Sequence, residues 1–180
     1  MFTKKKVLYF LILLIFVSGL DFWIFSSIKN SFNKVLNDNL LKTSQILSKS
    51  VSLVEDKYND WIQKTEEENE DLKIIYINGL PSFFETEDFY SDKSLYEFYK
   101  NNLNSEDFKD GIESAEYSEV YFSKNDYEIN NSKYRIIFSP VINDDFDVLG
   151  IAIIFFQMDE YLKFYRLINV FMYSIIIILF

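Results

Sequence analysis

Two apolar runs, one near each end of the chain, constrain its folding more than any other feature. Residues 7–28 are almost all Leu, Ile, Val and Phe; as an α-helix they extend roughly 33 Å, enough to cross a hydrocarbon core of about 30 Å. Residues 167–180 carry no charge but reach only about 21 Å. We therefore predict one transmembrane helix and the start of a second, which would finish beyond Phe180. A signal peptide cleaved at Val17-Ser18-Gly19 and a short hydrophobic tail on a complete protein are the alternatives.

Charge predicts the orientation of these spans. Three lysines, Lys4 to Lys6, precede the first run, whereas residues 30–165 hold 13 Lys/Arg against 27 Asp/Glu, a net charge of -14. Because basic residues stay on the cytoplasmic side, the middle of the chain should lie outside. We predict a multi-pass protein of the plasma or inner membrane. In this prediction residues 1–29 form a cytoplasmic stub and the first span, residues 30–165 form the extracytoplasmic domain, and residues 166–180 form the start of the second span. So acidic a surface repels nucleic acid and anionic lipid headgroups. The lipid bilayer is expected as a partner through the two apolar runs.

The chain has no cysteine and no histidine. Disulfides, Cys/His metal centres, thiol nucleophiles and Ser-His-Asp triads are therefore excluded. Carboxylates are plentiful, but no spacing among them singles out a nucleophile and its base. We expect no catalytic residue, cofactor or metal in these residues, and any enzymatic module would lie beyond Phe180. A membrane-tethered carboxylate enzyme remains an alternative.

After residue 30, apolar residues recur in steps of mostly three and four, the spacing of an amphipathic helix. They are Phe32, Leu36, Leu40, Leu47, Val51, Val54, Tyr58 and Trp61. We predict one helix of about thirty residues, continuous with the first span and ending in the acidic residues 66–71. A thinner row of Val35, Ile46 and Leu53 is expected to face the same helix of a second copy in a homodimer.

The periodicity then changes to that of a sheet. We expect a strand at 72–77 closed by Asn78-Gly79, an irregular stretch to residue 92, and a helix at 94–103 capped by Ser94. Further strands are expected at 117–123, 127–129, 133–138 and 146–157, the third of them stopped by Ser139-Pro140 and the last leading into a helix from Met158. The predicted fold is α+β, a long N-terminal helix packed on a small antiparallel sheet.

The run IIFSPVINDDFDVLGIAIIF at Ile136–Phe155, together with a long helix feeding a small sheet between two apolar segments, resembles the Cache (extracytoplasmic PAS-like) sensor domains of bacterial transmembrane receptors. The resemblance covers residues 30–165. It departs from the common pattern at Phe146, where a glycine is usual, and it lacks the Arg, Trp, Tyr and Asp set of the amino-acid-binding members. It implies a ligand-sensing domain that signals to a cytoplasmic module such as a histidine kinase. A structural or assembly protein of the cell envelope is the competing interpretation.

Four residues are candidates for binding a small ligand. Arg135, the only arginine between the two apolar runs apart from Arg166, could clamp a carboxylate bidentately, or it could pair with a local acid such as Glu119. Gly150 leaves space on the last strand, as the floor of a pocket walled by Tyr121 and Tyr134 or as a place where the long helix packs closely. The acidic groups at 66–71 and 144–147 could hold Ca²⁺ or Mg²⁺, but they match no known loop, and solvated acids explain them as well.

Overall fold

The structure is a computed structural model that describes residues 4–54 and 57–179. Within these ranges the side chains at 4–18, 20, 21, 25, 165, 169, 171–173 and 175–179 lie outside the description. The chain divides into two compact units. One comprises residues 1–40 and 168–180, and its described part is helical; the other, residues 41–167, contains the sheet.

Helix α1 runs from Lys4 to Val51, and α2 from Tyr58 to Glu68. The prediction of one unbroken helix reaching the acidic cluster is therefore wrong, because the chain leaves the helix after Val51. Two serines bond locally at this ending: the hydroxyls of Ser50 and Ser52 donate to the carbonyls of Leu47 and Lys49. Such local bonds compete with the helical ladder.

The two predicted rows of α1 differ in exposure. Leu36, Leu40, Leu47 and Val51 of the first row are buried. In the second row Val35 and Ile46 are 58% and 70% exposed, and Leu53, which follows the end of α1, is 70% exposed. The amphipathic pattern is thus confirmed for these residues.

The sheet is antiparallel and curled, with strand order β2-β1-β6-β5-β3 and with β4 pairing β5 off this path. Its strands are β1 (Leu72–Asn78), β2 (Glu87–Tyr90), β3 (Tyr121–Phe122), β4 (Tyr127–Ile129), β5 (Ser132–Ile142) and β6 (Val148–Gln157). The last strand in sequence is central in space, and every residue from Gly150 to Phe156 is buried. A near-continuous apolar run is typical of a strand covered on both faces.

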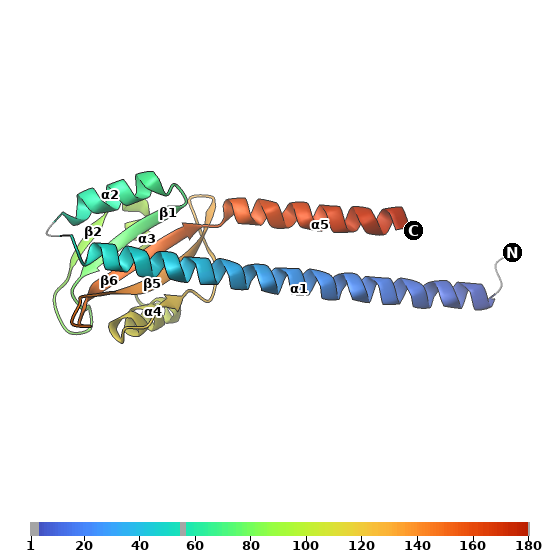
Figure 1. Cartoon of the computed structure of the whole chain (residues 1–180), viewed down its shortest axis with the longest axis horizontal. Helices are drawn as coiled ribbons and strands as arrows, with labels where there is room; N and C mark the ends of the chain where they lie inside the picture. The colour runs from blue at the N-terminus through green and yellow to red at the C-terminus, as the bar shows by residue number, and fades with distance from the viewer. Residues whose placement is uncertain (1–3, 55–56, 180) are drawn as a thin grey trace. The chain divides into compact units, whose positions relative to one another are not determined.

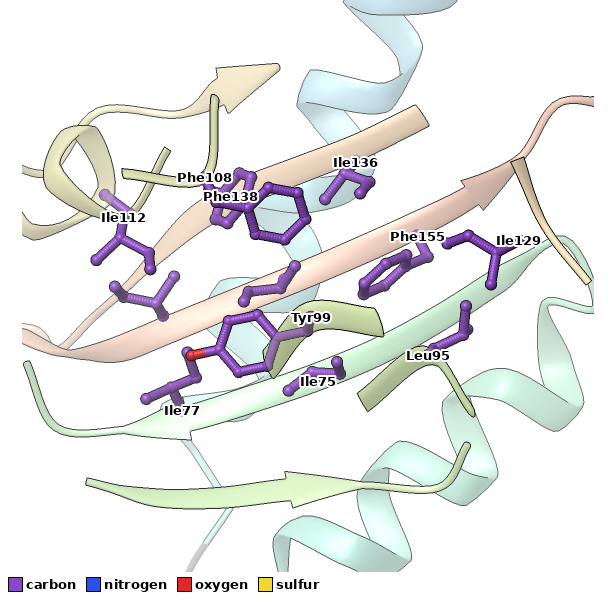
Figure 2. Packing of buried hydrophobic residues seen from close by; sticks show 13 residues of the cluster. Ile75, Ile77, Leu95, Tyr99, Phe108, Ile112, Ile129, Ile136, Phe138 and Phe155 are labelled. Atoms are coloured by element: carbon purple, nitrogen blue, oxygen red, sulfur yellow. The ribbon is translucent and has the colours of Figure 1, made fainter. Parts of the chain in front are cut away.

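Helices α3 (Lys93–Asn102) and α4 (Glu106–Glu116) cover one face of the sheet. The main core lies there, as Figure 2 shows, with Tyr99, Phe108 and Ile112 packed against Phe138 and Phe155 of the strands. Phe108 and Phe138 meet edge to face at 5.3 Å between ring centroids, a favoured aromatic geometry. Burying each such ring stabilises the fold by about 1.5–3 kcal/mol.

The opposite face is covered by the last turns of α1 and by α2 (Figure 1). Ser48 of α1 contacts Ser139 of β5, their hydroxyl oxygens 2.7 Å apart. On α2, Tyr58 packs on Tyr76 and Phe89 with ring centroids 4.8 and 4.9 Å apart. The domain therefore has two helical layers around one sheet, an α+β fold in which the long N-terminal helix contributes its end to the packing.

Two elements escaped prediction, namely β2 and α4. Strand β2 is a short edge strand of mixed polarity, and α4 begins at a Ser105 cap whose hydroxyl accepts from Phe108 N. The helix predicted at 94–103 exists, but Asp92 caps it, accepting from the backbone N–H groups of Ser94 and Leu95.

Strand β5 continues through Pro140 instead of stopping at Ser139. A proline removes one N–H from a β ladder. At Pro140 that loss is tolerated because β3 pairs with β5 only at Ile137 and Phe138, whereas β6 pairs along almost its whole length.

Helix α5 runs from Asp159 to Leu179, as expected after Met158. Among the described residues, no helix holds a stretch long and apolar enough to cross a membrane. Most side chains of the two predicted spans, residues 7–28 and 167–180, lie outside the described residues.

Candidate functional site

The four predicted ligand residues do not converge. Side chains alternate between the faces of a strand, so the neighbours Tyr134 and Arg135 point to opposite sides of the sheet. Tyr134 and Tyr121 belong to the face covered by α3 and α4. Gly150 faces the other side together with Val141, its partner on β5, and so does Arg135, which pairs with Phe156.

Arg135 already holds a carboxylate from its own chain. Its Nε donates to Asp126 Oδ1 at 2.9 Å, and its Nη2 approaches Asp126 Oδ2 at 3.4 Å. The acid is Asp126, in the turn after β3, and not Glu119. The bidentate geometry predicted for a ligand is thus met by the protein, which ties the 123–127 turn to β5.

Tyr121 belongs to a polar cluster that sequence reasoning missed. Buried Asp107 of α4 accepts hydrogen bonds from the hydroxyls of Tyr121 at 2.7 Å and Tyr127 at 2.6 Å, and from Lys124 N at 3.0 Å. Burial opposes ionisation of Asp107, but these donors outweigh it and hold its pKa below the ordinary value. Burial and the bond to Asp107 raise the pKa of Tyr121 to about 12. The cluster anchors the β3–β4 segment on α4.

The space left by Gly150 is filled. A Cβ there would overlap the carbonyl oxygen of Ile77 and lie 3.0 Å from the ring of Tyr76. Tyr134, on the other face, packs edge-on against Phe155 with centroids 6.3 Å apart. The long helix does approach this face of the sheet closely, at Ser139 of β5, which contacts Ser48 of α1.

Three pockets are described within residues 41–167, and none is lined by Arg135, Tyr121, Tyr134 or Gly150. One, of about 530 Å³, lies beside α2 around Glu66. Buried Glu66 turns inward there, accepting from Ile74 N at 2.8 Å and from Lys73 Nζ at 3.1 Å. Glu66 therefore accepts from a part of β1 that β2 does not pair, and this member of the acidic cluster is not a solvated acid.

A second pocket of about 530 Å³ lies where β6 passes into α5. We call it the junction pocket; its charged lining includes Asp71, Glu128, Lys133, Asp159, Lys163 and Arg166. It is the described pocket to which the start of α5 contributes, so a ligand in it would touch both the sheet and the helix that follows.

The junction itself is a network of hydrogen bonds around Asp159. Its Oδ1 accepts from Lys133 N at 3.2 Å and its Oδ2 from Gln157 Nε2 at 2.9 Å. Met158 N donates to Lys133 O at 2.7 Å. The bond from Gln157 is the main cause that holds the pKa of Asp159 below its ordinary value. The start of α5 is thereby fastened to the first residues of β5.

Among the described residues, no group of three acidic side chains is placed to hold a metal ion. The chain matches no protein-family model, and no curated protein is significantly similar to it.

Proposed function

We propose that this chain is the input half of a bacterial membrane receptor. In this proposal residues 30–165 are an extracytoplasmic, Cache-like ligand-sensing domain, and the apolar runs at 7–28 and from 167 onward are transmembrane helices. The charge asymmetry around the first run and the α+β fold with a long N-terminal helix support the proposal. We assign no catalytic step to these residues.

One observation carries the proposal: the central strand of the sheet leads directly into α5. Strand β6 is paired on both sides, buried on both faces, and ends at Gln157, two residues before the helix begins. A displacement of the sheet would therefore reach α5 through a short connection that Asp159 ties down. Shifts of about 1–2 Å between packed elements are a common means of transmission.

The mechanism requires a ligand that binds two arrangements of the domain with different affinity. Ligand binding would move β6 and α5 relative to the last turns of α1, and each helix would pass that movement to its apolar run. The partners in this proposal are a small-molecule ligand, the bilayer and a second copy of the chain, which the exposed row on α1 would contact. A histidine kinase is the output module we favour.

The test is a chimaera in which residues 1–180 are followed by the cytoplasmic part of a sensor histidine kinase, with a transcriptional reporter as readout. Asp159→Ala, which removes the side-chain hydrogen bond from α5 to β5, should shift the basal output several-fold. Asp145→Ala, at an exposed turn away from the junction, is the matched control. Equal output from the Asp159 variant, the control and the parent at equal membrane abundance would refute the proposed route.

A further inference from the structure

A groove of about 380 Å³ separates the last turns of α1 from the turn that joins β5 to β6. Gln45, Ser48 and Lys49 line it from the helix, Ser139 lines it from β5, and Phe146 lines it from the turn. Its volume lies within the range of small-molecule sites, about 300–1,000 Å³. All of these residues belong to the 41–167 unit.

Phe146 has a backbone conformation that is unfavourable for a residue with a bulky side chain. Its φ is +67°, a region in which a bulky residue is strained and a glycine is not. The turn holds it there: Asn143 Oδ1 accepts from Asp145 N at 3.0 Å and from Asp147 N at 2.8 Å. The ring is nevertheless 84% exposed. A strained residue that gains nothing from burial suggests a use for its side chain.

The floor of the groove offers a hydrogen bond. Ser48 and Ser139 are 5% and 1% exposed, and their hydroxyl oxygens lie 2.7 Å apart. Each hydroxyl has one hydrogen, and only one of the two hydrogens lies between the oxygens. Among the described residues, no acceptor is found for the second hydrogen of this buried pair. An oxygen atom of a ligand in the groove would supply that acceptor.

The groove is electrically neutral on an acidic domain. Lys49 and Asp144 are its only charged lining residues, one of each sign, whereas residues 30–165 carry a net charge of -14. The rest of the lining is hydroxyl, amide or apolar, with Gln45 and Asn143 as the amides. A strongly charged ligand of either sign would therefore meet one residue of its own sign as well as one of the opposite sign.

We propose that this groove binds an uncharged polyhydroxylated ligand of the size of a mono- or disaccharide. The C–H face of a sugar ring would stack on Phe146, while its hydroxyls would accept from the Ser48–Ser139 pair and exchange hydrogen bonds with Gln45 and Asn143. This inference gives a ligand class to the proposed sensor and rests on that function for its signalling role. A ligand here bridges α1 and the sheet, the two parts whose relative movement the receptor would report.

The experiment measures binding of glucose, N-acetylglucosamine and maltose to the full chain in nanodiscs, by saturation-transfer NMR and calorimetry. Glucuronate and glucosamine are the charged counterparts. We expect at least one neutral sugar to bind, and Phe146→Gly to weaken it about tenfold or more while raising the thermal midpoint. Ser139→Ala should weaken binding as well. Phe83→Ala, another exposed phenylalanine outside the groove, should leave it unchanged.

The groove assignment is overturned if no neutral sugar binds at millimolar concentration, if the charged sugars bind equally well, or if Phe146→Gly retains full affinity. The proposed function can fail separately. If a sugar binds through Phe146 but leaves the output of the kinase chimaera unchanged, the binding site is supported and the receptor function is contradicted. If the output responds to Asp159→Ala but no sugar binds, the receptor function is supported and the binding site is contradicted.

Discussion

The carboxylate of Asp159, the first residue of α5, accepts a hydrogen bond from the backbone N–H of Lys133 in β5 at 3.2 Å. The two residues are 26 positions apart, and the bond joins the beginning of one element to the beginning of another. Replacing Asp159 with Ala should cost about 1 kcal/mol of unfolding free energy. The diagnostic result is faster amide hydrogen exchange at Lys133 and in the first turn of α5. Glu160→Ala, at the exposed neighbouring position, should leave both rates unchanged, and equal effects of the two variants would contradict the assignment.

The Asp107 cluster predicts how stability depends on pH. Because the folded-state pKa of Asp107 lies below its ordinary value of about 4, its contribution is present above that value and is lost as the pH falls through the folded-state pKa. Asp107→Asn should therefore be less stable than the parent at pH 7. The difference should shrink between about pH 5 and pH 2.

Urea titrations of the two proteins across this range measure that difference. Asp110→Asn, on the same helix but bonded only to the exposed Lys124 ammonium, is the control and should follow the parent closely. A stability gap between the parent and Asp107→Asn that stays constant with pH would exclude ionisation of Asp107 as its source.

Gly150 predicts a steric effect. Alanine at this position would press its Cβ into the Ile77 carbonyl and the Tyr76 ring, and backbone cannot yield as a flexible side chain does. We expect Gly150→Ala to lose about 2–3 kcal/mol. Gly19→Ala, with no atom within 4 Å of the added Cβ, should be neutral or slightly stabilising in its helix. Thermal denaturation of both variants tests this, and equal midpoints would show that the contact relaxes freely.

The exposed row on α1 predicts self-association. Replacing Val35, Ile46 and Leu53 together with serine should convert a dimer to a monomer, because these side chains stay largely exposed among the described residues of their own chain. The fold should survive, since these side chains are largely exposed. Lys34→Ser with Lys42→Ser, at exposed polar positions of the same helix, is the control. Sedimentation in detergent measures the mass, and an unchanged mass of the triple variant would refute dimerisation through this face.

The elements that could be predicted are those with local signals. The apolar runs at β1 and β6 predicted these strands. The pair Asn78-Gly79 predicted a turn, and Gly79 has a φ of +101° there. The break after Val51 could not be predicted, because the apolar steps of three and four continue across it to Trp61. Helix α4 could have been predicted, because Ser105 is a capping residue and Phe108 and Ile112 follow it at helical spacing.

The four predicted ligand residues do not share one face of the sheet. For Tyr134 and Arg135 the reason is visible in the sequence, because neighbours in a strand point to opposite faces. What could not be foreseen is tertiary: that Asp126 would reach Arg135, that Tyr76 would fill the space beside Gly150, and that β3 and β4 would bring Tyr121 and Tyr127 to Asp107.

The most direct test of the account is the location of the acidic domain. Because the chain has no cysteine, single cysteines can report it: Glu113→Cys on the exposed face of α4 and Lys5→Cys before the first apolar run. In intact cells a membrane-impermeant maleimide should label Glu113→Cys and should reach Lys5→Cys only after the membrane is opened. Labelling of Glu113→Cys only after the membrane is opened would contradict the placement of this domain outside the cell and, with it, the proposed receptor.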